Sequence, residues 1–363
     1  MSEKRTILVA SGASGGHLFP ALAVAQALRE RFEVKVILGG SKFLDVVERT
    51  GLPYVRLPAA AFNDRGPIRL LWAVVKLGQG FFKALRLVVK ERPAVVFGTG
   101  GYATVALMLA AKLRGVPTVI HEQNVLPGRA NRFLARYADV VVLTFEDSLR
   151  YLDRVKGRVV VAGTPLRQEI LDAASLPVRR EEGMFNLLVL GGSQGARILS
   201  EVVPEMVAML PEAERARLRV VQQVRADDFE RVASQYAKLG LAGVTVESFF
   251  NDMPRRYAEA DLVIGRSGVG TVLECATLGV PAVYVPLELA DGHQKLNASV
   301  AERAGAAVVV EQAYFTPANL LVHVRALMQD TVRREAMSSA AKSLARPDAT
   351  ATVAQVVVES IKG

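Results

Sequence analysis

Short apolar runs recur along the whole chain, and several of them end in glycine or polar residues. Stretches with apolar residues at helical spacing lie between these runs, and this alternation is typical of parallel strands joined by helices. The expected strands cover residues 5–10, 34–38, 93–98, 117–121, 140–143, 159–162, 186–190, 218–222, 244–247, 262–264, 282–285 and 306–310. The expected helices cover residues 20–30, 103–114, 129–137, 271–278, 316–329, 331–345 and 349–361, and one more ends near residue 209. The pattern therefore predicts an α/β fold with parallel sheets.

Length and composition fit two domains of ordinary size. The chain has 363 residues and is 51% apolar, which is enough for two packed cores. Its single cysteine, Cys275, excludes a disulfide framework and fits a reducing cytoplasm. The first apolar run covers only Ile7 to Ala10, so we expect no signal peptide. No run reaches the roughly 18 apolar residues of a membrane-spanning helix.

The positive charge is concentrated in the first half of the chain. The net charge is +9, and residues 1–163 contain 24 Lys and Arg against 12 Asp and Glu, whereas the remainder contains 21 against 24. A basic half next to a slightly acidic one suggests a polyanionic partner for the first half. We find no basic-aromatic motif or helix-turn-helix pattern that would favour nucleic acid. An anionic membrane surface or a pyrophosphate substrate fits this charge.

Residues 62–92 combine apolar and basic side chains at helical spacing. Trp72, Phe81 and Phe82 are aromatic, and the basic residues include Lys76, Lys83 and Arg86. Such a segment is typical of a basic amphipathic surface for anionic lipid headgroups. A core helix with a solvated basic face is an equally good interpretation.

The first strand leads into a glycine loop, Gly12-Ala13-Ser14-Gly15-Gly16-His17. This spacing differs from the G-x-G-x-x-G pattern of dinucleotide sites, and the second strand ends without an acid for a cofactor ribose. We therefore expect no nicotinamide or flavin cofactor. His17 follows two glycines at a strand-to-helix turn, which brings an imidazole to the end of the sheet as a candidate base.

Polar residues also follow other strands of the first half. Gly98-Thr99-Gly100-Gly101-Tyr102 ends one strand, and Glu122-Gln123-Asn124 ends the next. Because ligands bind beyond the carboxyl ends of strands in open parallel sheets, these residues are candidates for a site. A helix-capping carboxylate is the alternative for Glu122.

The second half carries the residue types that a nucleotide sugar needs. Residues 265–268 form a small-residue loop in front of the 271–278 helix, whose start can face a diphosphate. Glu274 can accept bonds from ribose hydroxyls, and the Gln294 amide can hold sugar hydroxyls. A second glycine loop at 191–196 precedes another helix and has the same anion-binding character. An ordinary βαβ unit with polar loops is the alternative interpretation.

Eight motifs, taken in order, resemble one family. They are GASGGHLFPALAVAQAL, GTGGY, HEQNVLPGRANR, AGTPLR, LGGSQGAR, FFNDM, RSGVGTVLE and HQKLNA, and the match as a whole runs from residue 7 to about 355. The chain resembles the MurG family of glycosyltransferase family 28. Three places depart from the family pattern. Gln222-Gln223-Val224-Arg225 stands where the family usually has His-Gln-x-Gly, Gly292 replaces an acid, and the loop after Tyr102 lacks glycines that many relatives carry.

The resemblance implies a GT-B fold, in which two Rossmann-like domains with parallel sheets face each other across a cleft. It implies an N-terminal acceptor domain of residues 1–163, with about 346–363 returning to it, and a UDP-GlcNAc-binding domain of residues 164–345. It implies inverting transfer of GlcNAc from UDP-GlcNAc to the C4 hydroxyl of undecaprenyl-pyrophosphoryl-MurNAc-pentapeptide (lipid I), which forms lipid II. It also implies a peripheral protein on the cytoplasmic face of the bacterial membrane, with possible cell-wall and division protein complexes as partners.

The resemblance also implies roles for individual residues. His17 is the expected general base, with Glu122 as a second acidic candidate, and Glu274 and Gln294 are expected on the ribose and the sugar. The implied donor contacts are Ser14, Gly15, Gly16, Asn124, Arg167, Ser193, Phe250, Val269, Gly270, Thr271, Val272, Leu273, Glu274 and Gln294. The expected acceptor and membrane contacts are Gly101, Tyr102, Trp72, Lys76, Phe81, Phe82, Lys83 and Arg86.

The sequence contains no Asp-x-Asp motif, so we expect no required metal, and no cofactor. Two alternative functions are considered. One is a related transferase that glycosylates diacylglycerol and shares the nucleotide half. The other is a non-catalytic nucleotide-sugar-binding membrane scaffold, which the presence of both His17 and Glu274 argues against.

Overall fold

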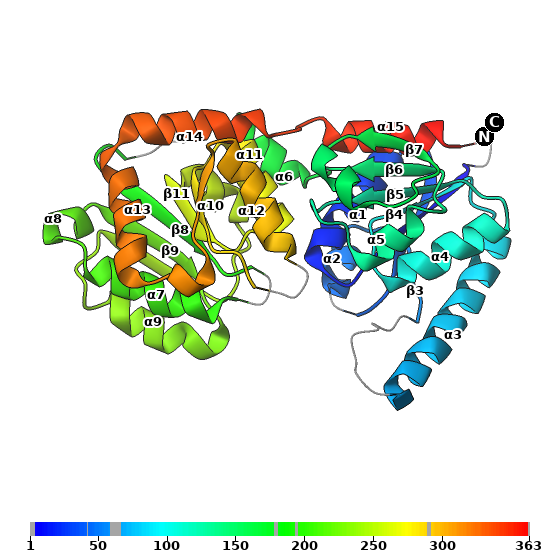
Figure 1. Cartoon of the computed structure of the whole chain (residues 1–363), viewed down its shortest axis with the longest axis horizontal. Helices are drawn as coiled ribbons and strands as arrows, with labels where there is room; N and C mark the ends of the chain where they lie inside the picture. Colours follow the sequence, from blue (N-terminus) through cyan, green and yellow to red (C-terminus); the bar gives the residue numbers. More distant parts are fainter. Residues whose placement is uncertain are drawn as a thin grey trace. The chain divides into compact units, whose positions relative to one another are not determined.

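The computed structural model describes residues 4–41, 43–58, 67–177, 181–192, 195–288 and 292–361, with only the backbone described over 67–74. The chain forms two compact units (Figure 1). Unit 1 comprises Met1–Arg167 together with Arg346–Gly363, and unit 2 comprises Gln168–Ala345.

Unit 1 is built on a seven-stranded parallel sheet. Central strands such as β1 and β4 have apolar, buried interiors, for example Ile7 to Ala10 in β1, as expected for parallel strands that helices cover on both faces. The strands in spatial order are β3 (Tyr54–Arg56), β2 (Glu33–Leu38), β1 (Thr6–Ser11), β4 (Val95–Gly98), β5 (Thr118–Glu122), β6 (Val140–Leu143) and β7 (Arg158–Val161).

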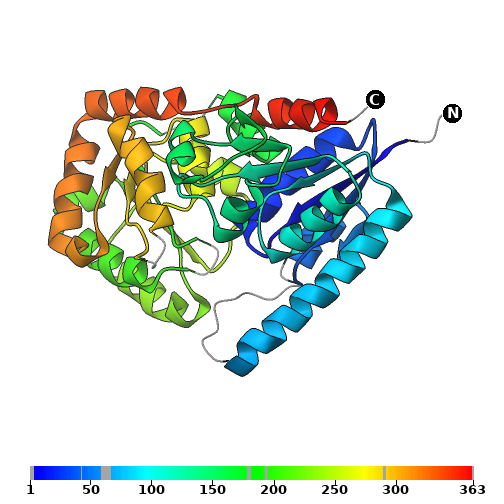
Figure 2. The same ribbon diagram turned by 45° about the vertical axis from the view of Figure 1, so that its right-hand side comes forward.

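The helices of unit 1 cover both faces of this sheet. The C-terminal helix α15 packs on α1, because Val353 and Val357 are buried in one cluster with Leu18 and Ala21. Figures 1 and 2 both show α3 (light blue) as a long helix whose N-terminal end extends beyond the sheet. The helices are α1 (Gly15–Leu28), α2 (Leu44–Arg49), α3 (Pro67–Glu91), α4 (Tyr102–Leu113), α5 (Arg129–Leu134), the 3-10 helix η1 (Glu146–Tyr151) and α15 (Ala349–Glu359).

Unit 2 contains a six-stranded parallel sheet with its own apolar core. The strands in spatial order are β10 (Gly243–Glu247), β9 (Leu218–Gln223), β8 (Phe185–Leu190), β11 (Leu262–Gly265), β12 (Ala282–Tyr284) and β13 (Ala307–Val309). Its helices are α6 (Gln168–Ser175), α7 (Arg197–Ala208), α8 (Glu212–Arg215), η2 (Ala226–Asp228), α9 (Phe229–Tyr236), α10 (Met253–Glu259), α11 (Val269–Leu278), α12 (His293–Arg303), η3 (Gln312–Tyr314), α13 (Pro317–Gln329) and α14 (Thr331–Ser343).

The structure corrects the expected start of the first helix. We expected this helix to begin at Pro20. Helix α1 instead begins at Gly15, since the Ser14 carbonyl accepts hydrogen bonds from the backbone N–H groups of His17 and Leu18. Pro20 lies inside the helix, where it removes one backbone donor. His17 therefore belongs to the first helical turn rather than to a loop.

Several other elements differ from the expected pattern. Helix α6 was not among the expected helices, and it buries Ile170 and Ala173 against its neighbours. Helix α5 ends at Leu134 rather than near residue 137. The short elements β3, α2, α9 and α10 were not predicted, because three to eight residues give too few periods for a pattern to be recognised.

Candidate functional site

The imidazole of His17 lies at the carboxyl end of the sheet in unit 1. The Nδ1 atom of His17 is 2.8 Å from Ser14 Oγ. The Thr99 hydroxyl, which follows β4, donates to the His17 carbonyl oxygen over 2.8 Å. The first turn of α1 is thus tied to the neighbouring strand end, so the ring has a defined position.

Glycines on two loops create the space for this ring. A Cβ atom on Gly12 would lie 2.9 Å from His17 Nδ1, and one on Gly100 would lie 3.0 Å from His17 Nε2. Gly101 has a φ of +87°, and its Cβ would lie 2.6 Å from the Cα of Gly12. Larger residues at these positions would displace the imidazole, so both glycine loops serve to position His17. Tyr102 begins α4 directly after these glycines and is partly exposed.

The carboxylate of Glu122 is buried and bonds to its own loop. Its Oε1 accepts from the backbone N–H of Asn124 over 2.8 Å and from the Asn124 amide over 3.2 Å. Its Oε2 accepts from the Gly128 N–H over 3.0 Å and from Asn131 Nδ2 over 2.9 Å. Gly128 is the N-cap of α5. This geometry is that of the capping carboxylate which the sequence left as an alternative.

His121, which precedes Glu122, is a buried residue that the sequence analysis did not single out. Its ring is fully buried, donates from Nε2 to the Gly163 carbonyl over 2.8 Å and accepts at Nδ1 from Gln123 over 2.9 Å. Burial lowers the pKa of His121 to about 4, so the ring is neutral near pH 7. A histidine in a buried strand indicates that the ring needs a hydrogen-bond partner inside the protein. The sequence does not show that this partner is Gly163, which lies 42 residues further along the chain.

Arg167 follows Gly163 at the end of the continuous part of unit 1. Its guanidinium carbon lies 5.0 Å from the centroid of the Phe19 ring, a cation–π contact with α1. The predicted residues Ser14, Gly15, Gly16, His17 and Arg167 thus belong to α1 or lie near it, and Asn124 adjoins Glu122.

In unit 2, the loop after β11 leads directly into α11. Gly268 is the N-cap, and the N–H groups of Val269, Gly270 and Thr271 lack partners inside the helix, as in any first helical turn. A Cβ atom on Gly268 or Gly270 would meet nothing within 4 Å. The start of α11 is therefore an open backbone surface suited to an anion. Val272 and Leu273 are buried and fasten the helix to the core.

Glu274 lies one turn into α11, near the buried Tyr257 of α10. Burial raises the pKa of Tyr257 well above its usual range, and the charge of the Glu274 carboxylate raises it further. The carboxylate is only partly buried. It is thus oriented by the neighbouring helix and still accessible to a ligand.

A buried arginine connects the loops of this region. Arg266 donates from one terminal nitrogen to the carbonyl oxygens of Val285 (2.9 Å) and Pro286 (3.1 Å). Ser267 Oγ donates to the Gln294 carbonyl over 2.9 Å, and the Gln294 side-chain oxygen accepts from the Leu287 N–H over 2.9 Å. The loop after β11 and the start of α12 are therefore held together. The sequence analysis did not single out Arg266, because its partners follow a different strand.

The remaining predicted donor residues lie on other loops of unit 2. Phe250 is buried, and the Arg256 guanidinium carbon lies 5.3 Å from its ring centroid. The adjacent Phe249 is exposed. Ser193 lies outside the described residues, whereas Gly192 and Gly195 beside it have left-handed φ values of +74° and +69°.

Helix α3 has features of both interpretations given for residues 62–92, a core helix and a basic amphipathic surface. Gly80, Ala84 and Val88 are buried on one face, and α3 packs against α4. Lys76, Lys83 and Arg86 are exposed, as is Phe82, whose ring packs edge-on against Phe81 at 5.9 Å. The side chain of Trp72 lies outside the described residues. A packed face and an exposed basic, aromatic face thus coexist in one helix.

Within the part of the chain that the structure describes, no helix combines the length and apolar character needed to cross a membrane. Nor does this part contain three or more His, Cys, Asp or Glu residues grouped so that they could hold a metal ion.

Comparison with known proteins identifies the family. The glycosyltransferase family 28 N-terminal domain matches residues 7–143, and the family's C-terminal domain matches residues 186–353. The UDP-N-acetylglucosamine–N-acetylmuramyl-(pentapeptide) pyrophosphoryl-undecaprenol N-acetylglucosamine transferase of Methylobacterium nodulans is 45% identical over 360 residues, which is 98% of this chain and 96% of the relative. The chain belongs to glycosyltransferase family 28. A transferase with the same name from Paramagnetospirillum magneticum is 40% identical, covering 98% of this chain and 97% of the relative.

Solved structures agree with the family 28 assignment. The crystal structure of Acinetobacter baumannii MurG has a TM-score of 0.78 at 30% identity, and the match covers 98% of this chain and 99% of that one. The resemblance to the MurG family and the expected GT-B class are thereby confirmed. A putative UDP-N-acetylglucosamine 2-epimerase from Listeria monocytogenes has a TM-score of 0.71 at 15% identity, covering 98% and 96%, and shows only that the fold is shared.

Proposed function

We propose that this chain transfers GlcNAc from UDP-GlcNAc to the C4 hydroxyl of lipid I, with inversion, and so forms lipid II in peptidoglycan synthesis. The observation that carries the proposal is near-full-length similarity, at 45% identity over 98% of the chain, to a relative whose name states this transfer. The positions of His17, the start of α11 and Glu274 supply groups that this chemistry needs.

His17 is proposed as the general base. If Nδ1 keeps its proton for Ser14 Oγ, 2.8 Å away, Nε2 presents its lone pair. Nε2 then takes the proton as the C4 oxygen attacks the anomeric carbon. The bond from that carbon to the UDP oxygen breaks, and UDP leaves with the electron pair. Amides at the start of α11 stabilise the charge that develops on the diphosphate.

Glu122 is proposed to position the site rather than to act as the base. Four N–H groups already bond to its two oxygens, so a proton would have to displace one of them. In contrast, Glu274 is proposed to accept bonds from the ribose hydroxyls and Gln294 to contact the sugar. Gly101 and Tyr102 are proposed on the acceptor side, and the donor contacts expected for the other residues of α1, α11 and the glycine loops remain part of the proposal.

The assay that tests the function compares two acceptors. Purified protein would be incubated with labelled UDP-GlcNAc and either lipid I or diacylglycerol, and the extracted lipids would be separated. We expect label only in the lipid I product, because the HEQN and GGHLFPALA motifs favour this acceptor. Label in diacylglycerol would favour the related lipid transferase, and UDP-GlcNAc binding without transfer to either lipid would favour the scaffold.

The exposed face of α3 is proposed to bind the anionic cytoplasmic surface of the bacterial membrane. Each basic residue near such a surface contributes about 1 kcal/mol. Replacing Lys76, Lys83 and Arg86 with Gln should therefore release most of the protein from vesicles containing anionic lipid, measured by sedimentation. A triple Gln variant of the exposed residues Lys238, Arg303 and Arg333 in unit 2 has the same net charge and should stay bound. Equal binding of both variants would refute the role of α3.

A further inference from the structure

The ends of two neighbouring strands in unit 2 bring an arginine to a glycine loop. Strands β8 and β9 pair in parallel register, with Val189 opposite Gln222, so their carboxyl ends lie side by side. Strand β8 leads into the glycine loop 191–196, and β9 leads through Val224 to Arg225. Arg225 therefore lies at the edge of the sheet where ligands bind in open α/β folds.

The side chain of Arg225 packs directly on the backbone of Gly195. A Cβ atom on Gly195 would lie 2.5 Å from Arg225 Cγ and 3.4 Å from its backbone nitrogen, and Gly195 has a φ of +69°. Only glycine can combine this backbone conformation with the side chain above it. The aliphatic part of the Arg225 side chain therefore covers Gly195 in the loop that precedes α7.

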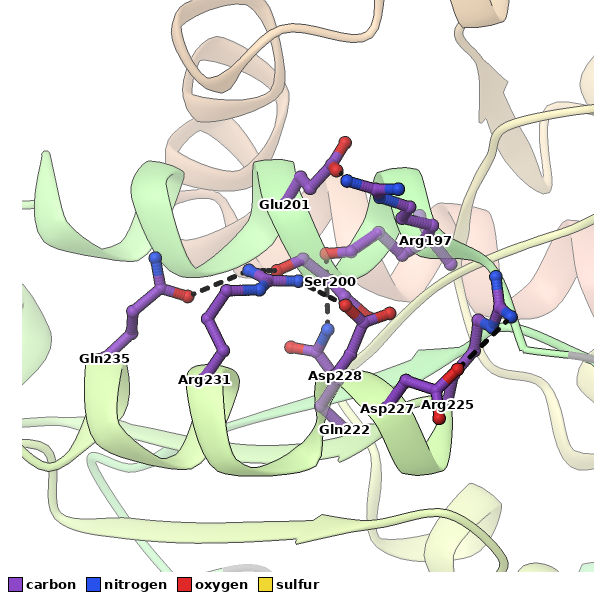
Figure 3. Close-up of polar contacts among 10 residues, drawn as sticks. Arg197, Ser200, Glu201, Gln222, Arg225, Asp227, Asp228, Arg231 and Gln235 are labelled. Carbon is purple, nitrogen blue, oxygen red and sulfur yellow. Dashed lines mark hydrogen bonds and ion pairs between the residues drawn. The ribbon is translucent and has the colours of Figure 1, made fainter.

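The guanidinium of Arg225 has weaker polar contacts than that of the nearby Arg231. Figure 3 shows Arg231 bonded to the Ser200 carbonyl (3.1 Å), to Asp228 (2.7 Å) and to Gln235, whereas Arg225 stands apart beside Asp227. The Arg225–Asp227 distance is 3.7 Å, and the two side chains are 47% and 87% exposed. A pair as exposed as this is weak, so a doubly charged diphosphate could replace Asp227 as the partner.

Gln222, three residues before Arg225, has a structural role. Its amide is buried between the Tyr236 hydroxyl (2.5 Å) and the Leu199 carbonyl (3.2 Å), which ties β9 to α9 and α7. Gln222 is thus held in the core, whereas Arg225 places a positive charge at the loop surface.

We propose that Arg225 is a further donor-binding residue of this chain, whose guanidinium pairs with the diphosphate of the nucleotide sugar beside Gly195. The inference rests on the proposed use of UDP-GlcNAc and deepens it. In this proposal Arg225 attracts the phosphate charge and does not recognise the uridine. The loss of affinity on replacing Arg225 should therefore grow with the number of phosphates on the ligand.

The test measures the affinity of the full chain for UDP, UMP and uridine by calorimetry, with Arg225→Ala, Arg225→Gly and Arg225→Lys variants. Loss of one charge-assisted contact should weaken UDP binding by about tenfold in the Ala and Gly variants. UMP should lose less, and uridine should be unchanged. The Lys variant should fall between wild type and Ala, because it keeps the charge but not the bidentate geometry.

The matched control is Arg219→Ala. Arg219 is on the same strand near its amino end, where it pairs with Glu181, so its loss should leave all three affinities unchanged. Wild-type affinity for UDP in the Arg225→Ala variant would overturn the inference. Equal losses for UDP and uridine, with a lowered melting temperature, would also overturn it, because they indicate a purely structural role. If the wild-type chain itself failed to bind UDP, the proposed function would fail rather than this contact.

Discussion

The carboxyl edges of the two sheets are organised in opposite ways. In unit 1 the polar groups bond to one another: the Glu122 carboxylate accepts four hydrogen bonds, and His17 lies against Gly12 and Gly100. In unit 2 the start of α11 is open, because a Cβ atom on Gly268 or Gly270 would meet nothing within 4 Å. One edge holds a side chain in place, whereas the other leaves backbone amides for a ligand.

This difference indicates how the two units divide the proposed chemistry. A base must be oriented before the substrate arrives, and for His17 the bond between Nδ1 and Ser14 Oγ and the close contacts with Gly12 and Gly100 provide that orientation. A diphosphate brings its own charge, so the second edge needs only unsatisfied donors and space. We therefore expect changes in unit 1 to affect turnover or stability, and changes in unit 2 to affect donor affinity.

The sharpest test of the comparison is His17→Ala. Loss of a general base typically costs 10²- to 10⁴-fold, so we expect turnover to fall at least tenfold while UDP affinity changes only a few-fold. Turnover and calorimetric UDP affinity would be measured on the same preparation. Ser14→Ala, which removes only the partner of Nδ1, should have a smaller effect on turnover. Near-normal turnover in His17→Ala would remove this residue from the mechanism.

Glu122→Gln distinguishes a positioning carboxylate from a catalytic one. The new NH₂ group would face an N–H donor, so we expect about 2–3 kcal/mol lower stability toward urea, together with reduced turnover. The pH profile of the remaining activity should keep the shape of the wild-type profile. A variant with normal stability whose pH profile has lost its acidic limb would instead identify Glu122 as the base.

Glu274→Ala tests the open edge of unit 2. Removing its bonds to the ribose should weaken UDP-GlcNAc binding by about tenfold, with a smaller effect on turnover at saturating donor. Glu302→Ala, an exposed acid on α12, is the control for the loss of one negative charge. A loss confined to turnover, with normal donor affinity, would contradict the division between the two edges.

The smallest expected effect is the pH dependence that His121 adds to unit 1. Its pKa is about 4 in the folded chain and 6.5 ordinarily, so the unfolded state binds the proton first as the pH falls. The stability that the neutral ring contributes is complete above pH 6.5 and declines toward pH 4, by about 1 kcal/mol between pH 7 and pH 5.5. Urea titrations across this range should show a shallower decline for His121→Asn than for wild type. Parallel curves would exclude the linkage.

The strands were predictable because parallel strands are buried on both faces and therefore appear as continuous apolar runs. Residues 140–143 were predicted with the bounds that β6 has, and most other strands with an error of one or two residues. The polar residues after these runs indicated the functional edges for the same reason, since the carboxyl ends of parallel strands meet at one edge. The start of α1 was predicted less accurately, at Pro20, whereas the helix begins at Gly15 and its first backbone hydrogen bonds run from His17 and Leu18 to the Ser14 carbonyl.

The sequence by itself determined the α/β class, the family and the candidate site residues, because apolar periodicity and contiguous motifs are local properties of the chain. Only the tertiary structure decided that Glu122 caps α5, that His121 bonds to Gly163 and that Arg225 crosses Gly195. Each of these contacts joins residues from different elements, and the distance between two such residues depends on how the strands are ordered in the sheet. No local pattern contains that information, so the same side chains could be recognised from the sequence but not assigned their partners.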